Sequence, residues 1–402
     1  MAKNNLSHRS FQTRAVHAGE RAPAADFTPV STPIYPSVGY LYGSMDDVDA
    51  VFAGTKPGYV YSRYATPTVT AFEAAVASLE GAEAAQAYSS GMAAIHASLL
   101  AAGARDGTTV VAALDVYGAT FTLISNLLAS LGVNARMVDV SNLDEVEMAV
   151  DETHPALLFA ETISNPLLKV ADVPALAELA HRHGAALLVD NTFASPYLYN
   201  PLRNGADYVI HSVTKYLSGH GDVLGGVVAT SLENKNRLFE QNKLIGSVLG
   251  PFEAWLALRG LKTLPLRMAQ QCHNAQRVAE WLRSHPRVAN VHHPSLPDHP
   301  QHELAERLFA GKGSGGVLSF AIKDADRAAV YRFMESLTLC LPATTLGDIY
   351  SLILHPATSS HRGLTPEERA RIGIPDNLVR LSTGIESVED ILADLETALS
   401  ST

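Results

Sequence analysis

The segment that decides the fold is PALAELAHRHGAALLVD, residues 174–190. Pro174 suits the first turn of a helix, and Gly184 is the kind of residue that ends one. Apolar residues recur on one face between them, and Ala185–Asp190 then reads as a buried strand. A helix followed by an apolar strand is the repeating unit of a parallel sheet covered by helices. Asp190 would lie at the carboxyl end of its strand, the edge where open α/β sheets bind ligands.

The same alternation of short apolar runs and helical segments extends from Glu73 to Ala229. It predicts an α/β domain with a mostly parallel seven-stranded sheet. The predicted strands are Ala84–Tyr88, Thr109–Ala113, Ala135–Val138, Ala156–Ala160, Ala186–Val189, Tyr208–His211 and Gly226–Ala229.

After Pro251 the pattern changes to long helices, predicted at Glu253–Lys262 and Pro265–Ser284, and then to a Pro- and His-rich loop at His292–Gln301. A smaller α+β domain follows from about Val288. Its predicted strands are Val317–Ile322 and Leu378–Ser382, and its helices begin with capping-box patterns at Thr365 and Ser387. We therefore expect three parts: an N-terminal arm (1–60, irregular up to about Thr55), a large domain (61–260), and a linking helix with a small C-terminal domain (261–402).

Composition excludes several classes of protein. The 402 residues carry 30 basic and 41 acidic side chains, a net charge of −11, with no run of five or more Lys or Arg, so nucleic acid is not an expected partner. Two distant cysteines, Cys272 and Cys340, argue against a disulfide framework and a structural zinc site. We find no secretory signal and no apolar stretch of the ~20 residues that span a bilayer. A cytosolic protein without membrane contact is expected.

The chemistry centres on Asp190 and Lys215, which lie 25 positions apart. In Ser212-Val213-Thr214-Lys215, an extended chain would place the hydroxyls of Ser212 and Thr214 on one side, suited to holding a phosphate. A deprotonated lysine can form a Schiff base, and a carboxylate facing a pyridine nitrogen keeps it protonated, so that the ring becomes an electron sink. An isolated motif of this kind is more often a surface lysine after a strand.

Two further turns favour a cofactor site over a surface lysine. Ser89-Ser90-Gly91-Met92 lies between a predicted strand and a helix, where backbone N–H groups can bind an anion and Gly91 permits close approach. Tyr117 also follows a strand and could stack on a cofactor ring. Taken alone, the first could be a plain turn and Tyr117 a core residue.

Together these motifs resemble the Cys/Met-metabolism family of pyridoxal 5′-phosphate (PLP) enzymes, which includes cystathionine γ-synthase, cystathionine γ-lyase, methionine γ-lyase and homoserine sulfhydrylases. The resemblance covers nearly the whole chain. It rests on Tyr61-Ser62-Arg63, Ser89–Met92, Tyr117-Gly118, Asn165-Pro166, Asp190-Asn191-Thr192, Ser212–Leu217 with Ser218-Gly219-His220, and Leu378–Ser382. The family implies PLP fold-type I, the aspartate aminotransferase-like architecture.

The resemblance assigns a role to each matched residue. Lys215 would be the Schiff-base lysine and proton shuttle, Asp190 the partner of the pyridine nitrogen, and Tyr117 the stacking ring that assists proton transfer. The phosphate would be bound by Gly91, Met92, Ser212 and Thr214. Asn165, Arg380 and the backbone of Thr345 would bind the substrate α-carboxylate, with Asn165 also near the phenolic oxygen of the cofactor. Tyr61 and Arg63 match residues that reach the phosphate of a neighbouring subunit, which implies a homotetramer built from active dimers.

An arginine in an apolar strand needs an anionic partner, so the alternative for Arg380 is an ion pair between elements. Several histidines, among them His220 and the pairs His181/His183 and His292/His293, lack carboxylate or thiolate company at ligand spacing, and no metal site is expected.

The resemblance implies γ-elimination from a γ-substituted L-amino acid such as cystathionine or methionine, giving 2-oxobutyrate and ammonia. The alternatives are γ-replacement, as in a γ-synthase or an O-acylhomoserine sulfhydrylase, and, more remotely, transamination. The chain departs from common family patterns at Thr66, Ala119 and Tyr350, while Thr345-Leu346-Gly347-Asp348 approaches the Ser-Leu-Gly-Asp of methionine γ-lyases. These differences leave the substrate open between cystathionine, methionine, an acylated homoserine and another γ-substituted amino acid, and of the possible reactions we favour that of a γ-lyase.

Overall fold

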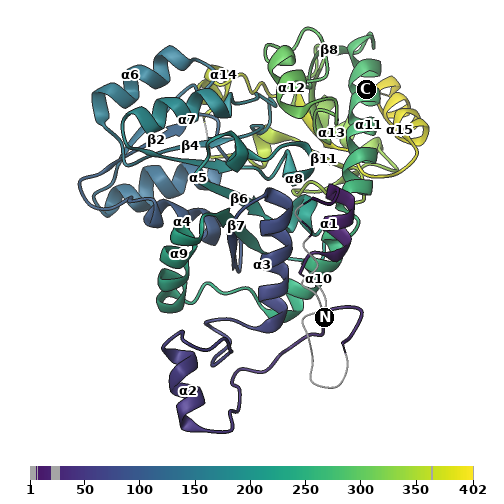
Figure 1. Cartoon of the computed structure of the whole chain (residues 1–402). Coiled ribbons are helices and arrows are strands. Elements are labelled where there is room, and N and C mark those ends of the chain that lie inside the picture. Colours follow the sequence, from purple (N-terminus) through teal and green to yellow (C-terminus); the bar gives the residue numbers. More distant parts are fainter. Residues whose placement is uncertain (1–5, 7, 20–27, 364, 402) are drawn as a thin grey trace.

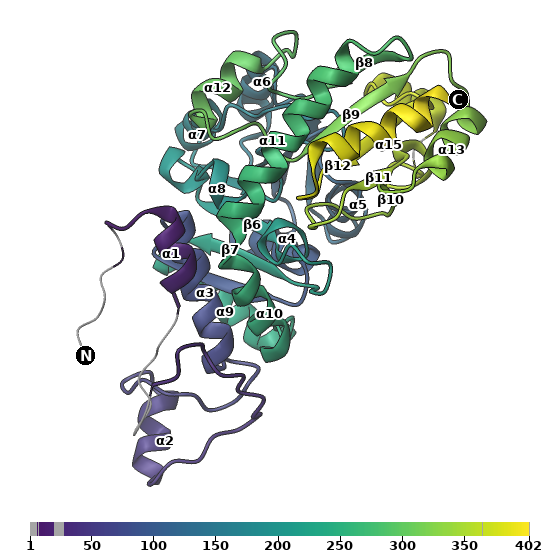
Figure 2. The same cartoon turned by 90° about the vertical axis from the view of Figure 1, so that its right-hand side faces the viewer.

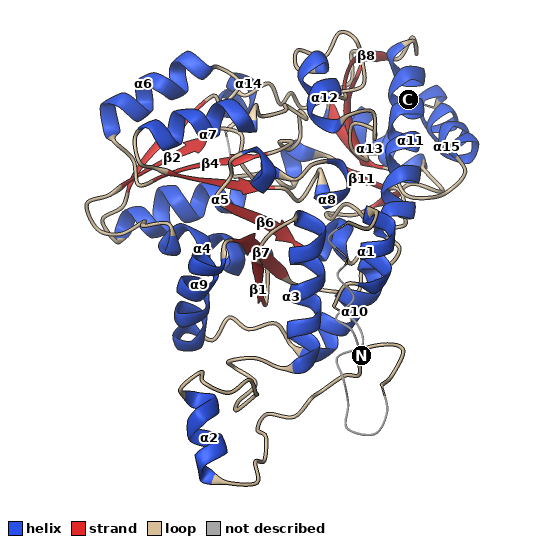
Figure 3. Ribbon diagram, viewed as in Figure 1, coloured by secondary structure: helices blue, strands red, loops and turns tan. Residues whose placement is uncertain are grey.

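The computed structural model describes residues 6, 8–19, 28–363 and 365–401 (Figure 1). Two β-sheets of seven and five strands are each flanked by helices, and an N-terminal segment extends away from the larger one. Helices lie on both faces of the large sheet, as Figure 3 shows by colour. The predicted α/β class with a second, smaller sheet is confirmed.

The large sheet has the strand order β1-β7-β6-β5-β4-β2-β3, and only β7 runs antiparallel to its neighbours. Parallel pairing of β3, β2, β4, β5 and β6 places their carboxyl ends at one edge. The strands are β1 (Ala84–Tyr88), β2 (Thr109–Ala113), β3 (Asn134–Val138), β4 (Leu157–Glu161), β5 (Ala186–Asp190), β6 (Tyr208–Ser212) and β7 (Gly226–Thr230). All seven predicted strands are present, but β4 begins and ends one residue later than predicted, so that Glu161 is its last residue.

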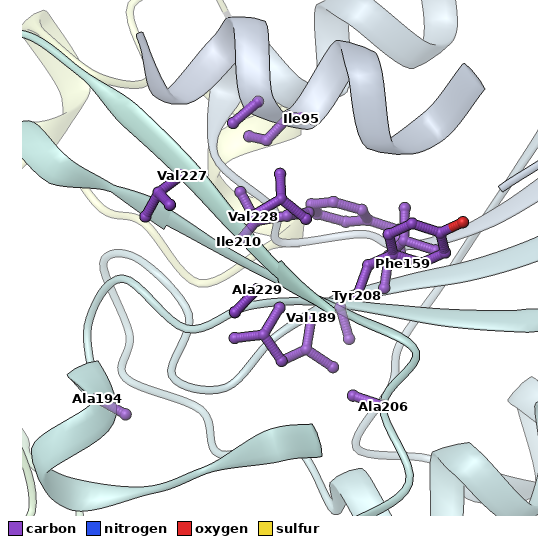
Figure 4. Close-up of a cluster of buried hydrophobic side chains, with 14 of the residues drawn as sticks. Ile95, Phe159, Val189, Ala194, Ala206, Tyr208, Ile210, Val227, Val228 and Ala229 are labelled. Atoms are coloured by element: carbon purple, nitrogen blue, oxygen red, sulfur yellow. The ribbon is translucent and has the colours of Figure 1, made fainter. Parts of the chain in front are cut away.

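The central strands form the core because their side chains are apolar on both faces. Figure 4 shows Ile95 on the side of the sheet covered by helix α4 (Gly91–Ala101) and Ala194 and Ala206 on the other side, with Ile210 and Val228 among the side chains between them. All five are buried. Burial on both faces explains why these strands read as continuous apolar runs.

The helices around this sheet are α3 (Pro67–Glu80), α4 (Gly91–Ala101), α5 (Gly118–Thr122), α6 (Leu143–Thr153), α7 (Val173–Arg182), α8 (Ser195–Leu198), α9 (Leu232–Ile245) and α10 (Pro251–Leu261), with short helical turns η1 (Leu123–Leu128), η2 (Pro201–Asn204) and η3 (Val213–Leu217). The start of α7 shows how the sequence sets an end: the Asp172 carboxylate accepts the backbone N–H of Ala175, and Pro174 lies in the first turn. The helix ends at Arg182, and Gly184 has a φ of +70°.

The small sheet has the order β10-β11-β12-β9-β8, with strands β8 (Val288–His292), β9 (Val317–Ile322), β10 (Leu341–Pro342), β11 (Leu352–Leu354) and β12 (Leu378–Ser382). The helices beside it are α11 (Leu264–Arg283), α12 (His302–Phe309), α13 (Arg327–Ser336), α14 (Pro366–Arg371) and α15 (Val388–Ser400), with the turn η4 (Pro356–Thr358). Figure 2 shows α11 and α15 side by side along this sheet.

Here the sequence was less informative. β9 and β12 were predicted, but β8, β10 and β11 were not, because they are short or partly exposed edge strands with weak alternation. The capping box predicted at Ser387 does not form: the hydroxyl of Ser387 bonds the carboxylate of Glu389 and caps no backbone N–H.

The N-terminal arm is more ordered than predicted. Two helices lie within it, α1 (Phe11–His17) and α2 (Met45–Phe52), capped by the hydroxyls of Ser10 and Ser44. α2 has no buried residue, which explains why no apolar face revealed it. Figure 1 shows α2 projecting below the large sheet. Residues 1–5, 7 and 20–27 of the predicted arm lie outside the described residues.

In the described part of the chain, no helix combines the length and apolarity needed to cross a membrane.

Candidate active site

A cavity of about 530 Å³ opens at the carboxyl edge of the large sheet and reaches the small sheet. This volume is within the usual range for small-molecule sites. The structure brings nine of the predicted residues into its lining: Gly91, Met92, Tyr117, Asn165, Asp190, Ser212, Thr214, Lys215 and Arg380.

Lys215 lies in η3, the turn that follows β6. The prediction of an extended segment here is wrong, since Val213–Leu217 is a π-helical turn in which Lys215 itself has φ −93° and ψ −129°. The Nζ atom of Lys215 donates a 2.7 Å hydrogen bond to the hydroxyl of Thr345. Burial, with a smaller contribution from the charge of Arg380, lowers the pKa of Lys215 from 10.5 to about 8. The amine is therefore far easier to deprotonate than a surface lysine.

For a lysine that carries PLP, as the resemblance implies for Lys215, this lowered pKa predicts how the protein without cofactor should take up PLP. Only the neutral amine attacks an aldehyde, so the rate of attachment should rise with pH through about 8 and then level off. The rate is measured by following the visible absorbance of lysine-bound PLP after mixing at a series of pH values. A rate that keeps rising to the pKa of an ordinary lysine would contradict the assignment.

Asp190 ends β5, and Thr192 fixes its carboxylate. Oδ1 accepts hydrogen bonds from the backbone N–H and the hydroxyl of Thr192, at 2.9 and 2.5 Å. The hydroxyl oxygen of Thr192 in turn accepts the backbone N–H of Ser212 at 2.9 Å. Burial raises the pKa of Asp190, and the bonds from Thr192 and the charge of His211 oppose that rise. Thr192 therefore links the end of β5 to the end of β6.

Glu161 is a cavity residue that our sequence analysis missed. It pairs with Asp190 in the register of β4 and β5, and its Oε1 accepts the backbone N–H of Tyr117 at 2.6 Å. Burial, followed by the negative charge of Asp190, holds the pKa of Glu161 well above its ordinary value. Extending the predicted strand by one residue would have placed this carboxyl at the ligand edge.

The start of α4 is the segment that the resemblance assigns to the cofactor phosphate. The hydroxyl of Ser90 caps the backbone N–H of Ala93 at 3.1 Å. A Cβ at Gly91 would lie 3.0 Å from the Cβ of Ser212, so the two segments approach as closely as a glycine allows. Thr214 bonds the backbone of Gly225 through its hydroxyl, which accepts from N at 3.2 Å. Backbone N–H groups at such a helix start fit a phosphate.

Arg380 supplies the opposite side of the cavity, from β12. It is 3% exposed; Nη1 donates to Oδ1 of Asn165 at 3.2 Å and Nη2 donates to the backbone oxygen of Thr345 at 2.9 Å. Nε is buried and has no hydrogen-bond partner among the described residues. Burial lowers the pKa of Arg380 to about 10. No acidic residue of the described chain forms an ion pair with it, so the guanidinium is free to bind the carboxylate of a ligand.

Three predicted residues are not in the lining: Tyr61, Arg63 and Thr345, of which Thr345 still bonds the lining residues Lys215 and Arg380. Tyr61 and Arg63 do not line the cavity of their own chain. The Arg63 guanidinium donates to the backbone oxygen of Lys243 and lies over the rings of Tyr61 and Tyr64, at 5.5 and 5.1 Å. Tyr117 does line the cavity, with its side chain 45% exposed.

The histidines singled out in the sequence do not gather. Among the residues that the structure describes, no three His, Cys, Asp or Glu side chains are placed to hold a metal ion. His181 and His183 pair separately with Asp207 and Asp151, and His293 is buried against the backbone oxygen of Gly315.

An easily deprotonated lysine, a fixed carboxylate and a glycine-lined helix start meet a buried arginine that lacks a counter-ion. This combination is what an enzyme would need to bind a phosphorylated aldehyde cofactor through lysine and a substrate through its carboxylate. The unpaired Nε of Arg380 and the close approach at Gly91 indicate that the residues fit PLP and an amino acid.

Comparison with known proteins supports this class. A model of the family described as "Cys/Met metabolism PLP-dependent enzyme" matches residues 12–400. The chain is 41% identical to an L-methionine gamma-lyase of Porphyromonas gingivalis, with 100% of both chains covered, and 43% identical to a cystathionine beta-lyase of Lactococcus lactis subsp. cremoris, covering 97% of this chain and 99% of the relative. The chain belongs to the Cys/Met-metabolism family of PLP-dependent enzymes.

The solved structure of a similar protein contains the cofactor bound to a lysine. A putative O-acetylhomoserine (thiol)-lyase of Campylobacter jejuni, which contains N′-pyridoxyl-lysine-5′-monophosphate, matches with a TM-score of 0.90 and 32% identity over 97% of this chain and 100% of that one. The expected PLP dependence and the fold-type I architecture are thereby confirmed. The relatives carry out different reactions at similar identity, so the comparisons establish a transsulfuration-family enzyme and leave the particular reaction open.

Proposed function

We propose that this enzyme catalyses γ-elimination on a γ-substituted L-amino acid, with a thioether such as methionine as the preferred class. The supporting observation is the charge of the cavity lining. Its charged side chains are Glu161, Asp190, Lys215 and Arg380. The proposal assigns Asp190 and Lys215 to the cofactor and Arg380 to the α-carboxylate, while Glu161 accepts the backbone N–H of Tyr117. The remaining wall includes Leu224, Leu346 and Leu354 and offers an apolar surface for an uncharged side chain.

Each proposed role follows from position. Arg380 and Asn165 would hold the α-carboxylate, and the buried Nε of Arg380, which has no partner among the described residues, supplies a further donor for it. Asp190, held by Thr192, would accept a hydrogen bond from the pyridine nitrogen. Ser212, Thr214, Gly91 and Met92 would hold the phosphate. Tyr117 would stack on the ring.

When bound, PLP supplies an electron sink for a carbanion beside the substrate amine. Lys215, released by the substrate amine, would move the proton from Cα, since its Nζ is buried and readily neutral. Tyr117 would assist proton transfer from the exposed side of the cavity. The reaction breaks the bond between Cγ and sulfur. In balance, the amino acid and one water give 2-oxobutyrate, ammonia and the released thiol.

The test is product analysis with methionine, cystathionine and O-acetylhomoserine, each with and without cysteine. We expect thiol-independent 2-oxobutyrate, fastest from methionine. If the amino acid is consumed only when cysteine is present, and a thioether of cysteine forms in place of 2-oxobutyrate, the reaction is γ-replacement instead. Pyruvate from cystathionine would mark β-elimination, and glutamate formed from 2-oxoglutarate would mark an aminotransferase.

We also propose that the active site is completed by a second copy of the chain, in a homotetramer of active dimers. Tyr61 and Arg63 lie outside the cavity of their own chain, and Tyr61 is exposed. Nearby on the projecting arm, Leu41, Met45 and Phe52 are exposed apolar residues, as expected of a surface that packs on a partner. Arg63 would then reach the partner's phosphate.

Mixed oligomers test this proposal. Lys215→Ala removes the lysine of its own site, whereas Arg63→Ala removes a phosphate ligand from the neighbour's site. Each variant alone should be nearly inactive, and co-expression with two affinity tags should yield hybrids with restored activity, because one site then has both groups. Hybrids as inactive as the parent variants would show that both residues serve the same chain's site.

A further inference from the structure

Helix α11 carries buried polar side chains on the face that packs against the turn η3. Arg267 and Gln271 lie four positions apart in this helix, and they are 3% and 0% exposed. Side chains with this spacing lie on the same face of a helix. Burial of a cation is costly unless its surroundings compensate it, so a buried arginine on this face needs a physical reason.

Arg267 is hydrogen-bonded through all three of its side-chain nitrogen atoms. Nη1 donates to the backbone oxygen of Tyr216 at 2.8 Å and Nη2 donates to that of Gly260 at 2.9 Å. Nε donates to the hydroxyl of Thr263 at 3.1 Å. The guanidinium therefore ties three segments together: the turn η3, the end of α10 and the start of α11.

The backbone oxygen of Tyr216 belongs to the residue that follows Lys215. Lys215 has φ −93° and ψ −129°, so the chain departs from helical geometry at this point inside η3. The guanidinium also packs against the chain further along: a Cβ at Gly219, whose φ is +68°, would lie 1.9 Å from Nη1. Arg267 thus fixes the direction in which the chain leaves Lys215.

One turn further along α11, Gln271 holds the loop that receives the hydrogen bond of Nζ. Its Nε2 donates to the backbone oxygen of Asp348 at 2.6 Å, and the charge of Asp348 also favours the Arg267 cation. The same loop contains Thr345, whose hydroxyl accepts from Nζ of Lys215 at 2.7 Å. One face of α11 therefore holds both segments that meet at Nζ.

We infer that Arg267 is a positioning residue for Lys215: through the backbone oxygen of Tyr216 it orients the turn so that Nζ is directed at the aldehyde of PLP. Arg267 is not one of the residues that line the cavity, so it would act through Lys215 and not on a ligand. The inference rests on the proposed role of Lys215. A residue that acts by orientation should affect the steps that need Nζ and spare those that do not.

Two substitutions remove the contact to different degrees. Arg267→Met keeps a long side chain and removes every donor. Arg267→Lys keeps the charge, but a single ammonium group cannot reproduce the bonds of a guanidinium to three separate acceptors. Asn274→Ala is the matched control, because Asn274 is also buried in α11 and donates to two backbone oxygens, those of Gly384 at 3.0 Å and Glu386 at 2.9 Å.

Two cofactor probes separate the orientation of the lysine from general damage to the site. The first is the rate at which PLP attaches to the cofactor-free protein, followed by its visible absorbance at a pH above about 8, where the amine of Lys215 is mostly neutral. The second is the dissociation constant of pyridoxamine 5′-phosphate, which has no aldehyde and cannot form the Schiff base. Only the first measurement needs a correctly placed Nζ.

We expect Arg267→Met to attach PLP about tenfold more slowly and to lose about tenfold in kcat, with KM unchanged, because Nζ is no longer held in the reactive direction. Arg267→Lys should slow both rates by about threefold. Pyridoxamine 5′-phosphate should bind to both variants as tightly as to the wild type. Asn274→Ala should lower the melting temperature and leave the attachment rate unchanged.

Three results would overturn the inference. One is attachment at the wild-type rate by Arg267→Met, or by Arg267→Lys if only that variant folds. The others are slower attachment with an equal loss of pyridoxamine 5′-phosphate affinity, and an equal slowing in Asn274→Ala, since either would indicate a general loosening of the structure. Lys215→Ala separates the two levels: if it still forms the visible absorbance band, the proposed role of Lys215 fails, whatever Arg267 does.

Discussion

Replacing Lys215 with alanine is expected to abolish the visible absorbance of lysine-bound PLP and to reduce kcat by about 10⁴-fold or more. The side chain provides both the covalent attachment and the group that moves the Cα proton, and proton transfer alone contributes up to about 10⁴. The fold should persist, because the change removes a single side-chain hydrogen bond, from Nζ to the hydroxyl of Thr345. Absorbance, elimination rate and melting temperature are measured on the same preparation.

Lys169→Ala is the matched control. Lys169 is partly exposed, pairs with Asp139 at 2.9 Å and is not one of the residues that line the cavity. Its loss should leave spectrum and rate unchanged, because exposed ion pairs contribute little. If the Lys215→Ala protein keeps the absorbance band, PLP must be attached to another lysine, and the assignment of Lys215 is wrong.

The second large effect is expected for Arg380→Lys. The charge remains, but a lysine cannot offer the planar fork that binds a carboxylate through two parallel N–H groups. We expect kcat/KM to fall about 100-fold, mainly through KM, which corresponds to about 3 kcal/mol for a charged hydrogen-bonded contact. Steady-state kinetics with methionine and a substrate-free PLP titration measure the two steps separately.

PLP binding should survive this change, because the proposed contact of Arg380 is with substrate. Arg307→Lys, at a surface pair with Asp172, is the control and should leave KM unchanged. If Arg380→Lys weakens PLP binding and leaves KM intact, the arginine serves the cofactor and the substrate assignment is wrong.

The large sheet could be predicted from sequence because its strands are buried on both faces. β1 and β2 have the predicted ends, since each is a short apolar run between polar turns. In the small sheet β9 and β12 could be predicted as well, but β8 could not, because it is half-exposed, with neither a continuous apolar run nor clean alternation. Helix α2 was not predicted for a similar reason: it has no buried face, so its sequence does not show the apolar periodicity by which a helix is recognised.

The candidate site divides in a similar way. Asp190 and Lys215 could be placed together because both follow parallel strands whose carboxyl ends share one edge. Glu161 required the correct last residue of β4, and strand ends are set by tertiary contacts as much as by sequence. Arg267 and Tyr216 are 51 positions apart, and nothing local to either residue indicates their hydrogen bond.

Identification of the lysine that carries the cofactor tests the central claim most directly. The protein saturated with PLP is reduced with borohydride, which converts a Schiff base into a stable amine, and the digested peptides are mapped by mass spectrometry. The account predicts a pyridoxyl-phosphate group on Lys215. A group found on another lysine, or on none, would contradict it.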